Sequence, residues 1–274
     1  MVEATITITK ITTVMAIRNE GHNTWMAAAY FLTRTFIGLL GLGAVAWGSV
    51  VLPSFWHQPT LNRAAAELLL GRTFKTQTLL AEVKQVDADE QGLGCDPTGL
   101  HNAVILRLAI LEAAVAAANP SLIDADYGVA YDTARRSLAC LPADPFVWLS
   151  LFWLDASKHG VEPHNDNYLR LAYALGPNEG WIAIWRTRIG VALFEQLPAD
   201  LSKQAIEDFI KLVDTGRLYS ESVEIFKGAA PPAQAQILEN LKTADDIPRQ
   251  RFARALYDEG FDIPGFNEPL RPWR

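Results

Sequence analysis

Two stretches share one layout: ARRSLACLPADPFVWLSLFW, residues 134–153, and YLRLAYALGPNEGWIAIWRT, residues 168–187. Each begins with an Ala- and Leu-rich segment of helical spacing, passes through a turn that contains proline, and ends in a second helical segment that carries Trp. The turn prolines, Pro142 and Pro177, lie 35 residues apart. A layout that returns at this period predicts stacked helix pairs.

The tryptophans of the second segments, Trp148 and Trp181, lie 33 residues apart. This period and layout resemble the tetratricopeptide (TPR) repeat, whose units have about 34 residues. The first stretch and the helix before it match the family's small, apolar, turn and aromatic positions at Ala130, Leu138, Pro142, Trp148 and Leu151. The sequence departs from the family at Phe152, where Gly is preferred, and at Asp155, where Tyr is preferred. The resemblance covers residues 126–196 and implies a right-handed helical solenoid that binds proteins or peptides.

The rest of the chain beyond residue 58 also consists of helical patterns separated by short breaks with Pro and Gly. No convincing alternating strand pattern occurs there. We therefore predict an all-α fold, a TPR-like solenoid preceded by one transmembrane helix. An Asp- and Gly-rich stretch, residues 87–99, is expected to be a loop between two helices. The predicted organisation is an N-terminal cytoplasmic segment 1–29, a transmembrane helix 30–56, a TPR-like domain 59–264 and a tail 265–274.

The hexapeptide GLGAVA, residues 41–46, has the G-x-G-x-x-A spacing of a dinucleotide-binding turn. Such a turn needs a strand before it, an amphipathic helix after it and an acidic residue about 20 positions further on. Here the hexapeptide lies inside an uncharged apolar run of 21 residues, 36–56, and the later segment LNRAAAELLLGR is helical. The context excludes a dinucleotide site, and a run of this length is typical of a transmembrane helix.

Basic side chains lie on the N-terminal side of this apolar run, at Lys10, Arg18 and Arg34. The positive-inside rule then places the N-terminus in the cytoplasm and the C-terminal domain in the periplasm, as in a single-pass inner-membrane protein. The alternative is a cleaved signal peptide whose cleavage site is residues 44–46. Because the apolar run continues well beyond Ala46, its length favours an uncleaved anchor.

Charge and cysteine content exclude several classes of function. Residues 61–274 carry 21 basic and 29 acidic side chains, whereas contacts to phosphates require clustered Lys and Arg. Nucleic acid is therefore not an expected partner. Two cysteines, Cys95 and Cys140, are too few for a four-cysteine zinc site. In an oxidising compartment they could form one disulfide, and two separate thiols are the alternative.

Large aromatic side chains concentrate in the region that resembles TPR. Trp148 and Trp153 lie on one predicted helix, and Trp181 and Trp185 lie on another, next to Arg186. Trp181 and Trp185 are four residues apart, so they share a helix face. Exposed along a groove, these rings would stack on sugars or hold a peptide. Facing inward, they would pack between stacked helices, which is the commoner location for Trp.

Four potential metal ligands occur within residues 157–167, SKHGVEPHNDN: His159, Glu162, His164 and Asp166. Their spacing matches no helical zinc motif, and Gly160 and Pro163 indicate a loop in which Asn165 or Asp166 caps the next helix. We therefore predict no metal site. We also predict no catalytic and no cofactor-binding residues, since no G-x-S-x-G, P-loop or paired-carboxylate motif stands out.

The sequence thus predicts a non-enzymatic periplasmic scaffold or adaptor that contacts lipid through one helix and binds other envelope proteins. Surface-polysaccharide assembly or export is the expected process, with polysaccharide as a candidate ligand. The alternative is a carbohydrate-binding or cell-wall-active enzyme on a helical scaffold, with Glu112 and Asp155 as candidate carboxylates. A third hypothesis places the partner contact in the membrane, at the small-xxx-small pair Ala44 and Gly48.

Overall fold

The structure is a computed structural model that describes residues 30–50, 52, 58–93 and 95–261. The chain divides into two units, Met1–Pro59 and Thr60–Arg274. The predicted N-terminal segment 1–29 and the predicted tail 265–274 lie outside the described residues. Among the described residues helices predominate and no strand occurs, which confirms the all-α fold class.

In the first unit, the structure describes one long helix, Tyr30–Val50. Its 21 residues are long and apolar enough to cross a membrane, and the rest of the chain buries none of its most apolar window. A second helix, Pro97–Ala116, meets the same criteria of length and apolarity, but 61% of its window is buried inside the second unit. The described part of the chain therefore has two candidate membrane helices, of which one forms part of a protein core and the other exposes its apolar side chains.

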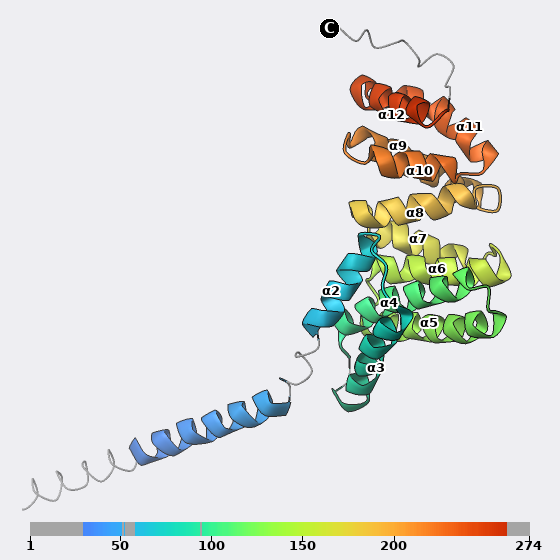
Figure 1. Cartoon of the computed structure of the whole chain (residues 1–274). Helices are drawn as coiled ribbons and strands as arrows, with labels where there is room; N and C mark the ends of the chain where they lie inside the picture. The colour runs from blue at the N-terminus through green and yellow to red at the C-terminus, as the bar shows by residue number, and fades with distance from the viewer. Residues whose placement is uncertain (1–29, 51, 53–57, 94, 262–274) are drawn as a thin grey trace, which may run out of the picture. The chain divides into compact units, whose positions relative to one another are not determined.

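Figure 1 shows the second unit, here called the body, as a stack in which α5 to α8 follow one another, α9 and α10 form the next level, and α11 and α12 lie at the far end. The closest packing joins consecutive helices as the pairs α4/α5, α6/α7 and α8/α9, which is compatible with a helical-repeat protein. The helices are α2 (Gln58–Leu69), α3 (Thr76–Leu93), α4 (Pro97–Ala116), α5 (Pro120–Cys140), α6 (Pro145–His159), α7 (Asp166–Leu175), α8 (Gly180–Ala192), α9 (Ala199–Asp214), α10 (Tyr219–Lys227), α11 (Pro231–Asn240), η1 (Leu241–Thr243) and α12 (Asp246–Asp258).

Three of these helices begin with the same local device. An Asp or Asn at the N-cap precedes a proline at the first helical position in α4, α5 and α6: Asp96-Pro97, Asn119-Pro120 and Asp144-Pro145. The cap side chain accepts hydrogen bonds from backbone N–H groups that the first turn leaves unpaired, and proline has no N–H group to satisfy. Asp144 accepts two such bonds, from the N–H groups of Phe146 at 3.0 Å and Val147 at 3.1 Å.

The prediction of a loop over residues 87–99 is wrong for most of its length. Helix α3 continues to Leu93, because the Ala, Glu and Gln of this stretch are good helix formers. Asp87 also fixes the helix to its neighbours: it accepts hydrogen bonds from Arg107 of α4 at 2.7 Å and from Arg136 of α5 at 3.2 Å. This acidic residue thus joins three helices instead of lying in a solvated loop.

Buried apolar side chains of the body form two large clusters. The first core contains residues of α2 to α8 and the beginning of α9, including the fully buried Leu106, Phe152 and Leu169. The second core contains residues from the end of α8 to α12, including the fully buried Phe209 and Phe252. Helices α8 and α9 contribute to both, so the cores meet at this pair.

Glycine permits two close approaches in the stack. A Cβ atom at Gly176 would lie 2.9 Å from the side chain of Pro145, so the α7–α8 turn packs directly on the start of α6. A Cβ atom at Gly190 would lie 2.7 Å from the Cβ atom of Ala205, which shows how closely α8 approaches α9. A larger side chain at either position would push the two elements apart.

Candidate functional site

An aromatic cluster joins the first turns of α4, α6 and α8. It consists of His101, Phe146 and Trp181, and each ring contacts the other two. The centroid distances are 5.4 Å between His101 and Phe146, 6.3 Å between His101 and Trp181, and 5.2 Å between Phe146 and Trp181. Tilted and edge-on contacts of this kind are favourable for aromatic pairs. Because Phe146 is buried and Trp181 is 38% exposed, the cluster presents one supported indole ring to solvent.

Asp144 connects this cluster to the helix cap described above. Its Oδ2 lies 2.5 Å from Nδ1 of His101, while its Oδ1 caps α6. The contact to Asp144 engages Nδ1 and leaves Nε2 as the ring nitrogen outside this contact. The aromatic cluster therefore combines an apolar ring face with a polar ring edge. This chemistry suits the binding of a peptide side chain or a sugar ring.

The other three predicted tryptophans are half-buried and take part in packing. Trp148 donates a hydrogen bond from Nε1 to the carbonyl oxygen of Pro142 at 2.8 Å, and its ring stacks on Tyr168 with 5.6 Å between centroids. Trp153 and Trp185 pack against buried apolar clusters of the body. Of the four tryptophans singled out in the sequence, Trp181 alone is exposed.

Arg186 lies in the core, where it joins α8 to α7 and α9. Its Nε and Nη2 donate to Oδ2 of Asp208 at 3.0 and 2.6 Å, and its Nη1 donates to the carbonyl oxygens of Ala172 and Gly176 at 3.2 and 3.0 Å. The guanidinium group also lies 4.1 Å from the ring centroid of Tyr173. With 1% of its surface exposed, Arg186 is placed to hold helices together and not to meet a ligand.

The two cysteines are joined in the structure by a disulfide, Cys95–Cys140, with 5.5 Å between Cα atoms. Cys95 directly precedes the cap of α4, and Cys140 ends α5, so the bridge closes the open end of this helix pair. In the first unit, Ala44 is exposed and Gly48 is half-buried on the helix Tyr30–Val50. The space around a Cβ atom at Gly48 is open, as a contact with another helix would require.

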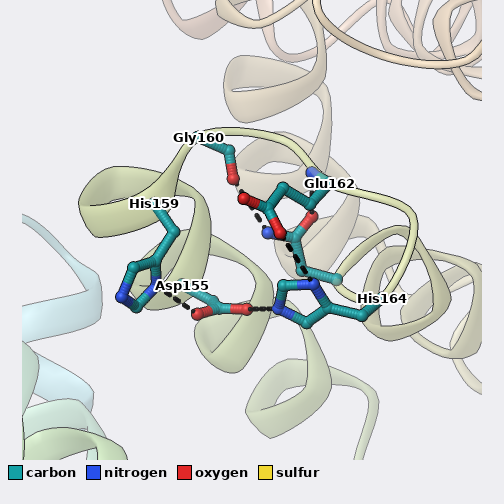
Figure 2. Close-up of polar contacts among 6 residues, drawn as sticks. Asp155, His159, Gly160, Glu162 and His164 are labelled. Atoms are coloured by element: carbon teal, nitrogen blue, oxygen red, sulfur yellow. Dashed lines mark hydrogen bonds and ion pairs between the residues drawn. The ribbon is translucent and has the colours of Figure 1, made fainter.

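Figure 2 shows a second polar group, centred on Asp155 at the end of α6. His159 Nδ1 lies 2.8 Å from one carboxylate oxygen of Asp155, and His164 Nε2 lies 2.6 Å from the other. The second nitrogen of His164 lies 3.2 Å from the carboxylate of Glu162. Asp155 is buried, whereas both histidines and Glu162 are exposed. The sequence motif contained the two histidines and Glu162 but not Asp155, which the sequence singled out only as a departure from the TPR pattern and as a candidate carboxylate of the alternative enzyme.

The loop between α6 and α7 is held by Asn165 in a way that the sequence did not predict. The sequence predicted that Asn165 or Asp166 caps α7; Asn165 does occupy the N-cap position, but its side chain makes no cap hydrogen bond. Its Oδ1 accepts from the N–H group of Glu162 at 3.0 Å, and its Nδ2 donates to the carbonyl oxygen of Gly160 at 2.9 Å. These two bonds hold the loop in a compact turn. Gly160, at the start of this turn, has a positive φ of 84°, a conformation that glycine adopts readily.

Burial and hydrogen bonding shift the pKa of Asp155 in opposite directions. Burial raises the pKa of Asp155, and the hydrogen bonds to His159, His164 and Asn165, together with the charge of His164, lower it. The net pKa lies below the ordinary value of 3.8, so the carboxylate is ionised at neutral pH. In the described part of the chain, no group of three or more His, Cys, Asp or Glu side chains is arranged to hold a metal ion. The contacts of Asp155 with His159 and His164 anchor the α6–α7 loop to α6.

A cavity of 640 Å³ lies between α9 and α11. Its floor is apolar, and Lys203, Lys211 and Glu207 stand at its rim on α9. Only one carboxylate, that of Glu207, is among the lining residues, and neither the aromatic cluster nor Asp155 belongs to them. A carboxylate pair of the glycosidase type is therefore absent from this cavity lining.

No model of a known protein family, no curated protein and no solved structure matches the chain.

Proposed function

We propose that this protein is a membrane-anchored adaptor of the bacterial envelope. Its first apolar helix lies in the inner membrane, and its helical body lies in the periplasm and binds other envelope proteins without catalysing a reaction. Surface-polysaccharide assembly or export is the process in which we place it, by analogy of fold. The observation that carries the proposal is that the helix Tyr30–Val50 is uncovered along its most apolar window, while the other apolar helix, α4, is largely buried in a stack of helices.

Length and charge support the membrane assignment and its direction. At about 1.5 Å per residue, a helix of 21 residues spans the hydrocarbon core of a bilayer, about 30 Å thick. The basic residues that precede the apolar core of this helix, including Arg34, favour a cytoplasmic N-terminus. The disulfide Cys95–Cys140 supports a body outside the cytosol, because cytosolic thiols are kept reduced.

The shape and surface of the body support a role in binding. Stacked helix pairs present the first helices of successive pairs on a shared surface, and the aromatic cluster lies where three such helices begin. Exposed Trp on a rigid base is typical of residues that dominate protein interfaces, since it adds contact area with little loss of side-chain entropy. We therefore assign the partner contact to Trp181 and the surface around it.

The arrangement of acidic residues favours an adaptor over an enzyme. A glycosidase needs two carboxylates that face one bond, one of them with a raised pKa. Of the two candidates, Glu112 of α4 has a pKa that burial raises, as a catalytic acid requires, but Asp155 is buried and both of its carboxylate oxygens are engaged by histidines. Neither lines the cavity between α9 and α11.

The membrane assignment is tested by reporter fusions. Alkaline phosphatase fused after residue 261 is active only in the periplasm, and green fluorescent protein exported by the general secretory route fluoresces only in the cytoplasm. We expect phosphatase activity and no fluorescence. Fluorescence without phosphatase activity would place the body in the cytoplasm and contradict the proposal.

The binding surface is tested by site-specific photo-crosslinking in intact cells. Benzoylphenylalanine replaces Trp181 or, as a matched control, Tyr257, an exposed aromatic residue of α12 that lies outside the aromatic cluster. We expect discrete crosslinked products of the Trp181 variant, identified by mass spectrometry as envelope proteins, and at most background from the Tyr257 variant. Equal patterns at the two positions, or none at Trp181, would contradict the assignment of this surface.

A further inference from the structure

Helix α5 has a face that no other part of the described chain covers. The helix packs against α4 and α6, and Figure 1 shows it near the lower end of the stack, below α6. The buried residues of α5 share one side of the helix: Ala130, Thr133, Ala134, Ser137 and Leu138. Outside this side, Leu122 is 49% exposed and Val129 is 39% exposed. A helix that only covers its own core carries polar residues at such positions, so these apolar side chains indicate a contact that the single chain does not make.

The positions along the centre of this uncovered face have the spacing of a helix that pairs with another helix. They are separated alternately by four and three residues: Ser121, Ala125, Gly128, Asp132, Arg135 and Ala139. Gly128 is half-buried and the other five are exposed. An alternation of this kind keeps one face of a helix toward a partner helix over several turns.

Opposite charges lie at the two ends of the uncovered face. Asp124 is in the N-terminal half of α5, and Arg135 is in the C-terminal half. Neither side chain has an ion pair or a hydrogen bond with the residues that the structure describes, whereas the neighbouring Arg136 is engaged by Asp87 of α3. Asp124 and Arg135 are 11 positions apart, about 16 Å along the helix axis, which is too far for them to pair within one chain.

We propose that the protein forms a homodimer in which the α5 helices of two copies pack antiparallel on this face. A two-fold axis at residue 130 places Asp124 of each copy beside Arg135 of the other, so the ion pair forms twice. In the same register Asp132 lies opposite Gly128, and Arg135 lies opposite Ala125, so each longer side chain meets a small one. Parallel packing in register would instead bring like charges together. The homodimer goes beyond the proposed function and does not depend on it.

Register-specific crosslinking tests the homodimer in isolated membranes. The full-length protein carries Val129→Cys or Ser121→Cys, both at exposed positions of α5, and is treated with a short bis-maleimide. In the proposed register the two copies of residue 129 are about 3 Å apart along the helix axes, and the two copies of residue 121 are about 27 Å apart. The native cysteines are joined to each other and do not react. We expect a crosslinked dimer from Val129→Cys and only background from Ser121→Cys.

Charge reversal tests the two ion pairs. Asp124→Arg and Arg135→Glu each replace both attractive contacts with like charges, and the mass of each full-length variant is measured by light scattering in detergent. We expect each variant to dissociate at least about 10-fold more readily than the wild type. An equimolar mixture of the two should regain the affinity of the wild type, because each substituted side chain then faces its opposite charge. Arg251→Glu, at an exposed position of α12, is the control and should leave the dimer intact.

Four outcomes would overturn the proposal. A monomeric wild type without a crosslink from Val129→Cys excludes the homodimer. Equal crosslinks from Val129→Cys and Ser121→Cys exclude the register. A dimer that persists in both charge reversals assigns self-association to another surface, such as the helix Tyr30–Val50. A crosslink from Val129→Cys to a different protein assigns the face to another partner. Crosslinking from Trp181 is unaffected by these results, so a failure of this inference is distinguishable from a failure of the adaptor function.

Discussion

The two halves of the body are held together by different means. In the first half, helices α4, α5 and α6 begin with an Asp or Asn cap and a proline, and a disulfide closes the α4/α5 pair. In the second half, none of the described helices from α8 to α12 has a side-chain cap hydrogen bond. Its elements are joined by the buried pair Arg186–Asp208 and by edge-on contacts of Phe252 with Phe209 and Phe226.

The helix caps of the first half are local bonds, whereas the buried ion pair and the ring contacts of the second half join different helices. A helix cap acts within one turn and survives small shifts of neighbouring helices. A buried ion pair stabilises only when both partners and their surroundings are in place, and a single partner left alone is a buried charge without compensation. We therefore expect single substitutions to damage the second half more severely than the first.

The largest effect is expected from Arg186→Met. Removal of the guanidinium leaves the buried Asp208 with only the exposed Lys211, 3.5 Å away, as a counter-ion, and the loss of a buried partner costs about 3–5 kcal/mol of unfolding free energy. Urea denaturation followed by circular dichroism measures this loss. The double variant Arg186→Met with Asp208→Leu should recover most of it, because no charge is then left in the core. Arg188→Met, at an exposed position on the same helix, is the control and should change stability by less than about 0.5 kcal/mol. A single variant as stable as this control would contradict the comparison of the two halves.

Loss of the disulfide should cause the next-largest loss of stability, and this loss should be confined to the first half. The bridge spans 45 residues, for which the loss of chain entropy in the unfolded state corresponds to about 4 kcal/mol as an upper value. Reductant should lower the denaturation midpoint of the wild type and leave that of Cys95→Ser with Cys140→Ser unchanged. Hydrogen exchange should rise in α4 and α5 and stay constant in α10 to α12. Equal increases in both halves would show that the halves do not unfold separately.

A smaller loss is expected from Asp144→Ala, which removes the cap of α6 and the acceptor of His101 together. A cap contributes about 1 kcal/mol and a hydrogen bond a similar amount, so the loss should be about 2 kcal/mol. Glu179 occupies the N-cap position of α8 without a cap bond, so Glu179→Ala is a matched control. The thermal midpoint of Glu179→Ala should equal that of the wild type. A loss of stability in Glu179→Ala as large as that in Asp144→Ala would contradict the distinction between capped and uncapped helices.

The smallest effect is expected from the protonation of Asp155. Its folded pKa is lowered from 3.8, so the unfolded state binds the proton more readily, and the resulting stabilisation is present above that value and lost as the pH falls through the folded pKa. The denaturation midpoint of the wild type should therefore fall more between pH 5 and pH 2.5 than that of Asp155→Asn, which has no carboxylate to protonate. Parallel pH profiles for the two proteins would exclude a contribution from this residue.

Residues whose effect is local made parts of the chain predictable. The proline turns, the tryptophan spacing and the apolar run at 36–56 gave the helical class and one of the two apolar helices that could cross a membrane. The pairing of Cys95 with Cys140 could be named as one of two alternatives because the chain has only these two cysteines. What a residue does within its own turn or through its own composition is visible in the sequence.

The rest of the candidate site depended on contacts between distant residues. His101 and Trp181 are 80 positions apart, and nothing in either neighbourhood predicts that their rings meet. Arg186 could not be assigned to core or surface because its partner, Asp208, lies on another helix. The loop predicted over 87–99 was wrong for the same reason, since Asp87 is engaged by arginines of two other helices.

The turn at Gly176 has a consequence for the geometry of the whole stack. No side chain fits between this residue and Pro145, and its carbonyl oxygen accepts a hydrogen bond from Arg186 at 3.0 Å. The close approach of the α7–α8 turn to α6 therefore depends on the absence of a Cβ atom at Gly176. The hydrogen bond from Arg186 of α8 stabilises this arrangement. Replacing Gly176 with alanine would act as a wedge and change the spacing between the α7–α8 turn and α6 while leaving every individual helix intact.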